Sequence, residues 1–269
     1  MRKPQYIVAP SSGLSLCYVR AGRQHLPAEA GPPIVLVHGF AAGIAMNWKV
    51  TSWLKMLTAA GRRVVALDCR GHGESEKPHD PEAYGGDQMP ADVIRLMDHL
   101  ALERADLMGY SMGGMISSYL LVHHPARFSS VVLAGIGGAA IDRGSFDPEK
   151  VAVALTASES GSAGDEVGRA FRAFAEQGGN DLLALAAVMR SRRALVSSEE
   201  LARVEKPVLV VVGEKDDLVG DPRSLKDAIP GSRLVLVPGK DHLTAVPDRR
   251  YKKAVLDFLS ERRGQAATV

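Results

Sequence analysis

The chain has 269 residues, of which 46% are hydrophobic and 24% charged, and 33 basic residues nearly balance 31 acidic ones. This composition is ordinary for a folded protein of one large or two small domains, and the net charge of +2 argues against nucleic-acid binding as its main function. No apolar run reaches the roughly 18 residues that span a bilayer, and the N-terminus lacks the apolar stretch of a signal peptide.

Cysteine usage bounds the cellular compartment and the metal chemistry. Cys17 and Cys69 are the only cysteines, so they cannot form a disulfide framework, and their spacing matches no zinc motif. Two isolated cysteines suit a reducing compartment. We therefore expect a cytoplasmic protein that binds neither nucleic acid nor membrane.

Short apolar runs alternate with helical patterns along most of the chain. Two N-terminal runs, Tyr6–Val8 and Leu14–Tyr18, are typical of antiparallel strands at a sheet edge. Near-continuous apolar strands follow at Ile34–Val37, Val64–Leu67, Ala105–Met108, Val131–Ala134, Pro207–Val212 and Leu234–Val237. Helical patterns cover Asn47–Ala60, Ala91–Leu102, Met112–His123, a short segment from Pro222, and Asp248–Glu261. Strands without polar alternation are buried on both faces, which predicts an α/β fold: a mostly parallel, doubly wound sheet of about eight strands flanked by helices.

One long segment interrupts this alternation. Between the strands that end at Ala134 and begin at Pro207, no β-rich run appears. Asp147 followed by Pro148 is typical of a helix start, and further helical patterns cover Asp165–Gln177 and Asn180–Leu195. We therefore expect an α/β core made of residues 1–136 and 205–269, with residues 137–204 inserted between two core strands as a helical cap.

The strongest chemical motif is the run Gly109-Tyr110-Ser111-Met112-Gly113, which matches G-x-S-x-G. It lies directly between a predicted strand and a predicted helix, as the nucleophile elbow of a hydrolase requires. A serine on such a sharp turn exposes its hydroxyl, and the two glycines remove side chains where the turn meets neighbouring backbone. The following helix N-terminus favours developing negative charge. Ser111 is therefore the predicted nucleophile.

With this elbow the chain resembles the α/β-hydrolase fold superfamily over nearly its whole length. The other motifs that carry the resemblance are His38-Gly39-Phe40, the D-x-R-G-x-G-x-S loop from Asp68 to Ser75, Gly213-Glu214-Lys215-Asp216 and Gly239-Lys240-Asp241-His242. The family order of serine, acid, histidine implies Asp216 as the acid and His242 as the base. Asp217 competes with its neighbour for the acid position. Serine in the elbow argues against a haloalkane dehalogenase or an epoxide hydrolase, which the resemblance associates with aspartate there.

The resemblance also implies which groups would bind the substrate. The backbone N–H groups of Phe40 and Met112 would stabilise the oxyanion. The Phe40 ring is a candidate for lining the acyl pocket, with simple packing as the alternative. Phe171 and Phe174 share one face of a predicted cap helix and are candidate substrate-binding residues, again with packing as the alternative. No glycine-rich segment matches a dinucleotide or Walker motif and no cluster has metal-ligand spacing, so no cofactor or metal is expected.

These features predict a serine hydrolase that cleaves carboxylic esters or lactones through an acyl-enzyme, with a small-molecule ester or lactone as its partner. A ligand sensor on the same fold with slow turnover is one alternative. A cofactor-free haloperoxidase or perhydrolase, or a carbon–carbon bond hydrolase, is another. The sequence specifies neither the acyl and alcohol groups nor the oligomeric state.

Overall fold

A computed structural model describes residues 3–9, 13–23, 31–142, 146–158 and 165–266. Within them lies an eight-stranded sheet with the order β1-β2-β4-β3-β5-β6-β7-β8. The strands are β1 (Gln5–Val8), β2 (Ser15–Ala21), β3 (Ile34–Val37), β4 (Val64–Leu67), β5 (Ala105–Tyr110), β6 (Phe128–Ala134), β7 (Val208–Gly213) and β8 (Arg233–Val237). β2 pairs antiparallel with β1 and β4, and the other neighbouring strands pair in parallel. The predicted fold class and its antiparallel edge are confirmed.

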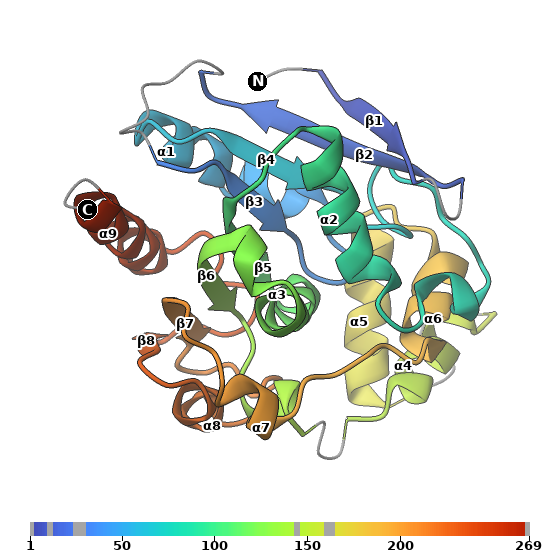
Figure 1. The fold of residues 1–269 in the computed structure, drawn as a ribbon. Coiled ribbons are helices and arrows are strands. Elements are labelled where there is room, and N and C mark those ends of the chain that lie inside the picture. Colours follow the sequence, from blue (N-terminus) through green and yellow to red (C-terminus); the bar gives the residue numbers. More distant parts are fainter. Residues whose placement is uncertain (1–2, 10–12, 24–30, 143–145, 159–164, 267–269) are drawn as a thin grey trace.

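Helices cover both faces of this sheet (Figure 1). Those of the core are α1 (Trp53–Ala59), α2 (Gln88–His99), α3 (Met112–His123), α8 (Pro222–Ala228) and α9 (Arg249–Ala266). Alternate side chains of β3 belong to different hydrophobic clusters: Val35 and Val37 pack with α2 and α3, whereas Ile34 and Leu36 pack with α1 and α9. All four are fully buried, as expected for a strand between two helical layers.

The predicted helix over Asn47–Ala60 is wrong as a single element. The chain forms a π-helix over Ile44–Val50 and then α1, which begins at Trp53. Ser52 separates them with a φ of 66°, in the left-handed region that cannot continue a right-handed helix. Thr51, just before it, donates its hydroxyl to the carbonyl of Asn47 at 2.5 Å. Asn47 lies within this π-helix, and its side chain contacts the loop after β3 described below.

Among the described residues between β6 and β7 there are four α-helices: α4 (Pro148–Thr156), α5 (Glu166–Gln177), α6 (Leu182–Arg190) and α7 (Ser198–Leu201). We call residues 137–204 the helical insertion. Aspartates cap three of these helices, with Asp147, Asp165 and Asp181 each accepting a backbone N–H of the first turn. The predicted Asn180–Leu195 helix is shorter than expected, and α7 was not predicted. Figure 1 shows α4, α5 and α6 grouped together at one side of the sheet.

In the part of the chain that the structure describes, no helix combines the length and the apolar character needed to cross a bilayer.

Candidate active site

Ser111 lies on a strained turn between β5 and α3. Its φ of 54° and ψ of −114° are rare for a residue with a side chain, a strain typical of functional sites. Both flanking glycines are required by space. A Cβ on Gly109 would lie 2.0 Å from the carbonyl oxygen of Gly113, and a Cβ on Gly113 would lie 2.1 Å from that of Val37. The turn therefore folds only with glycine at these positions, and it holds Ser111 at the start of α3.

Three predicted residues meet at this turn. His242 Nε2 lies 2.9 Å from Ser111 Oγ, and His242 Nδ1 lies 2.7 Å from Asp216 Oδ2. A carboxylate at Nδ1 keeps the proton on that nitrogen, which leaves Nε2 able to accept the proton of the serine hydroxyl. Asp216 is only 7% exposed, whereas Asp217 is exposed. The structure therefore brings Asp216, and not Asp217, to the histidine.

The elements that carry these side chains explain why they meet. Ser111 follows β5, Asp216 follows β7 and His242 follows β8. Parallel strands end at one edge of the sheet, so loops that leave them face the same crevice. The loop after β8 is anchored twice: the Tyr110 hydroxyl donates to the carbonyl oxygen of His242, and Trp53 Nε1 donates to the carbonyl oxygen of Val246 at 2.8 Å.

The loop after β3 is held by two buried polar side chains. His38 Nδ1 donates to the carbonyl oxygen of Gly39 at 2.8 Å, while its Nε2 accepts the N–H of Cys69 at 2.9 Å. Asn47 Oδ1 accepts the N–H of Gly39 at 2.9 Å. Both peptide groups of Gly39 are therefore fixed, including the one whose N–H belongs to Phe40. Sequence reasoning missed Asn47, because it lies in the π-helix over Ile44–Val50 and belongs to none of the recognised motifs.

The two predicted oxyanion donors come from two segments: Phe40 from the loop after β3, and Met112 from the start of α3, directly after Ser111. Within the described residues, the N–H groups of Phe40 and Met112 donate to no protein acceptor. A Cβ on Gly39 would lie 3.4 Å from Ser111 Cβ, so the Phe40 loop passes directly beside the serine. Unsatisfied N–H groups next to a nucleophile are the feature that oxyanion stabilisation needs.

Two other histidines lie near the site but are kept neutral. Burial, with a smaller contribution from the neighbouring His38, lowers the pKa of His72 to about 3. Burial also lowers the pKa of His38, although the Asp68 carboxylate at 4.0 Å opposes that shift. His72 Nδ1 donates to the carbonyl oxygen of Arg70 at 3.0 Å. Both side chains brace backbone, and in the described structure neither hydrogen-bonds Ser111.

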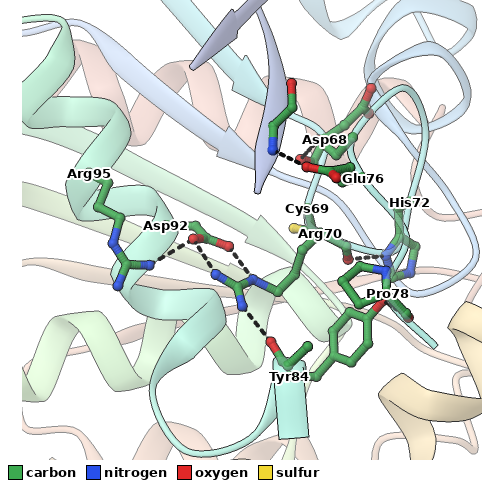
Figure 2. Close-up of polar contacts among 12 residues, drawn as sticks. Asp68, Cys69, Arg70, His72, Glu76, Pro78, Tyr84, Asp92 and Arg95 are labelled. Atoms are coloured by element: carbon green, nitrogen blue, oxygen red, sulfur yellow. Dashed lines mark hydrogen bonds and ion pairs between the residues drawn. The ribbon is translucent and has the colours of Figure 1, made fainter. Parts of the chain in front are cut away.

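The loop from Asp68 to Ser75 is tied down by charged side chains (Figure 2). Asp68 accepts the N–H of Ile44 at 2.7 Å and that of Glu74 at 3.1 Å. Arg70 makes two bonds of 2.7 Å to the Asp92 carboxylate of α2, and both side chains are 1% exposed. A bidentate pair of this kind is geometrically specific, so it fixes the loop whose Cys69 N–H holds His38.

Two cavities open at Ser111, one of about 170 Å³ and one of about 410 Å³. Among the described residues, five line both: Phe40, Ser111, Phe171, Leu218 and His242. The rings of Phe40 and Phe171 meet edge to face with centroids 5.7 Å apart. The helical insertion therefore contributes directly to the walls around the serine.

Apolar side chains of the insertion divide between lining and packing. Phe174, the second predicted residue, lines the larger cavity, and Met189 lines the smaller one. Leu182 and Leu183 of α6 line neither cavity. In the described ranges, no group of three or more His, Cys, Asp or Glu side chains is arranged to hold a metal ion.

Comparison with known proteins gives a consistent picture. A family model described as the alpha/beta hydrolase fold matches residues 32–186. The solved enol-lactonase from Burkholderia xenovorans LB400 is 28% identical with a TM-score of 0.77, over 95% of this chain and 100% of that chain.

Curated relatives match over shorter stretches. The 2-hydroxymuconate semialdehyde hydrolase of Pseudomonas sp. (strain CF600) is 37% identical over 111 residues, which are 40% of this chain and 38% of that protein. The 3-oxoadipate enol-lactonase 2 of Acinetobacter baylyi is 45% identical over 71 residues, 26% of each. The matched segments thus span well under half the length of these curated relatives.

Proposed function

The chain belongs to the alpha/beta hydrolase fold family, and we propose that it is a serine hydrolase that cleaves carboxylic esters or lactones. One observation carries the proposal: His242 contacts Asp216 at 2.7 Å and Ser111 at 2.9 Å where two cavities meet. The histidine contacts the serine through one ring nitrogen and the buried carboxylate through the other. This arrangement activates a hydroxyl for acyl transfer. The full-length likeness to an enol-lactonase supports lactones as a substrate class.

In the proposed mechanism, Ser111 Oγ attacks the acyl carbon while His242 Nε2 takes its proton. Asp216 stabilises the imidazolium that results and holds Nδ1 in place. The Phe40 and Met112 N–H groups bind the negative oxygen, and losing one such donor typically costs roughly 3–4 kcal/mol of transition-state stabilisation. The imidazolium then protonates the leaving alcohol. Water activated by His242 releases the acid, and no cofactor takes part.

The helical insertion, residues 137–204, is proposed to act as a cap on a core of residues 1–136 and 205–269. Phe171 of α5 packs on Phe40 and lines both cavities, so the insertion would shape the space available to the substrate. The Asn180 amide also donates to the carbonyl oxygen of Ala41 at 2.9 Å, which ties the insertion to the loop that carries Phe40.

A substrate panel tests this proposal. Purified protein would be assayed with aryl esters, alkyl esters and lactones, and the product counted per enzyme. We expect steady turnover far beyond one equivalent for at least one ester or lactone. A single slow burst of one equivalent would instead indicate a ligand sensor. Halogenation that depends on acid and peroxide, or cleavage of a carbon–carbon bond without ester hydrolysis, would replace the proposal with one of those chemistries.

A further inference from the structure

The two cavities differ in size in a way that limits the substrate. An engineered protein cavity of about 150 Å³ holds one benzene molecule. The smaller cavity, about 170 Å³, therefore suits a single ring or a short branched chain. The larger cavity, about 410 Å³, has more than twice that volume.

The walls of the two cavities come from different elements. The smaller one is lined by Met115 and Tyr119 of α3 and by Ala139, which follows β6. The larger one is bounded by Ala170 and Phe174, on α5. In the described lining, formally charged side chains are limited to Arg193 in the smaller cavity and Glu166 in the larger one, so most of both walls is apolar.

The residues common to both cavities form a divider beside the nucleophile. Phe40, Phe171 and Leu218 line both spaces, and both contain Ser111 and His242. The carbonyl carbon of an ester stands between its acyl and alcohol parts. When that carbon is held at Ser111, the two parts leave in different directions, and each has a cavity of its own.

We propose that the substrate is an ester with two apolar arms of unequal size, a ring-sized arm in the smaller cavity and a bulkier arm in the larger one. This inference rests on the proposed ester hydrolysis and adds the substrate class to it. Its physical basis is the burial of apolar surface, which favours an arm in proportion to the area that its cavity removes from water.

Two matched ester series and two matched variants test it. One series keeps a methyl alcohol and lengthens the acyl chain from acetyl to decanoyl. The other keeps an acetyl group and lengthens the alcohol from methyl to decyl. The variants are Ala139→Leu and Ala170→Leu, because each alanine lines one cavity only and neither is fully buried.

We expect each variant to lower the ratio of long-chain to short-chain kcat/KM by about tenfold in one series, and the affected series to differ between the variants. If both variants act on the same series, on both series equally or on neither, the assignment of two separate arms is overturned. Wild-type hydrolysis of methyl acetate, the shortest member, reports on the proposed function itself. A wild type that hydrolyses neither esters nor lactones overturns the proposed function. One that hydrolyses lactones only, or short esters with both variants lacking opposite effects on the two series, overturns the two-arm inference alone.

A second feature concerns the base. The Tyr110 hydroxyl donates to the carbonyl oxygen of His242, and the two rings lie 5.4 Å apart between centroids. Tyr110 is 4% exposed, and its ring packs against Gly135, where a Cβ would lie 2.8 Å from Cζ. The ring is thus confined on one side and bonded to the base's main chain on the other.

From these contacts we infer that Tyr110 is a positioning residue for His242. Asp216 orients the imidazole through Nδ1, but the backbone of His242 sits in a loop beyond β8. The hydroxyl of Tyr110 fixes that backbone relative to the elbow, since Tyr110 directly precedes Ser111 in the chain. A misplacement of the base by 1 Å can cost about a hundredfold in rate.

Tyr251 offers a matched control. Its ring lies 6.4 Å from that of Tyr110 and is 1% exposed, but its hydroxyl has no hydrogen-bond partner in the described structure. Tyr→Phe at either position removes one buried hydroxyl and keeps the ring. We expect Tyr110→Phe to lower kcat about tenfold to a hundredfold with KM within about twofold, and to slow labelling of Ser111 by a fluorophosphonate in parallel. Tyr251→Phe should change neither rate.

Urea unfolding of both variants separates positioning from folding. Equal losses of kcat in the two variants, or a wild-type kcat and labelling rate in Tyr110→Phe, would overturn the positioning role. A loss of stability in Tyr110→Phe without a change in kcat would assign its hydroxyl to folding alone.

Discussion

The α/β core and the helical insertion contribute to one site by different physical means. The core supplies groups held by directional bonds, such as His242 between Asp216 and Ser111 at 2.7 and 2.9 Å. The insertion supplies packed side chains, chiefly Phe171 and Phe174, which line the cavities. A hydrogen-bonded array tolerates few substitutions, whereas an apolar wall can be built from many side chains. The contrast predicts that changes in the core stop the reaction and that changes in the insertion redirect it.

The largest effect is expected at the nucleophile. Ser111→Ala removes the attacking oxygen, and loss of a serine nucleophile can lower kcat roughly a millionfold. The fold should persist, because the hydroxyl touches His242 and packs no core residue. Ester turnover and near-UV circular dichroism would be measured on the same sample. Robust hydrolysis by a well-folded variant would break the proposed mechanism.

The acid gives a sharper comparison within the core, because two aspartates are adjacent. Asp216→Asn keeps the size but loses the charge that stabilises the imidazolium, a change that cost roughly ten thousandfold in a serine protease. Asp217 is exposed, so Asp217→Asn should stay within about tenfold of wild type. Steady-state kcat for one aryl ester checks both. The reverse ranking would assign the acid to Asp217, and normal rates in the double variant would exclude both.

In the insertion we expect altered selectivity. Phe171→Ala opens the divider between the cavities and Phe174→Ala enlarges the larger one, so each should shift the preference for ester chain length by about tenfold. The ratio of kcat/KM for long and short esters measures this, with urea unfolding alongside. Both variants losing stability while the ratio stays constant would show that these rings only pack the insertion.

The smallest effect concerns acid stability of the core. An unfolded histidine takes up a proton near pH 6.5, whereas burial lowers the pKa of His72 to about 3. Between these values the unfolded state binds the extra proton, so the free energy of unfolding falls as pH falls, by up to about 1.4 kcal/mol per pH unit for this group. The slope from His72 is about half its maximum at pH 6.5 and fades above about pH 7.5. His72→Asn should flatten the dependence between pH 6 and 4 in urea titrations, and an unchanged slope would contradict the assignment.

Local motifs made the core predictable. The elbow was predictable because a Cβ on Gly109 or Gly113 would lie within 2.1 Å of a backbone oxygen. Only glycine fits at these two positions, so the motif is visible in the sequence. β3 and β4 matched their predicted ranges because both are buried on both faces and have no polar residue. The resemblance implied Asp216 as the acid with Asp217 as its competitor, and the loop geometry separates the buried Asp216 side chain from the exposed Asp217.

Other features depend on contacts between distant segments. Asn47 reaches Gly39 from a π-helix over Ile44–Val50, which the helical pattern predicted over Asn47–Ala60 does not reveal. The sequence analysis assigned no role to Tyr110, because its hydroxyl bond to His242 spans 132 residues. The cavities follow from packing between α3, α5 and the loops, where apolar side chains that line a wall look the same in sequence as those that fill a core, as Leu182 shows.

Covalent labelling tests the central claim, that Ser111 is the nucleophile activated by His242, most directly. Wild-type protein would be treated with increasing amounts of a fluorophosphonate, and peptide mass spectrometry would locate and quantify the adduct while ester hydrolysis is measured on the same aliquots. We predict one adduct, on Ser111, with the fraction of activity lost equal to the fraction labelled. An adduct on another residue, or full labelling of Ser111 with hydrolysis retained, would contradict the account.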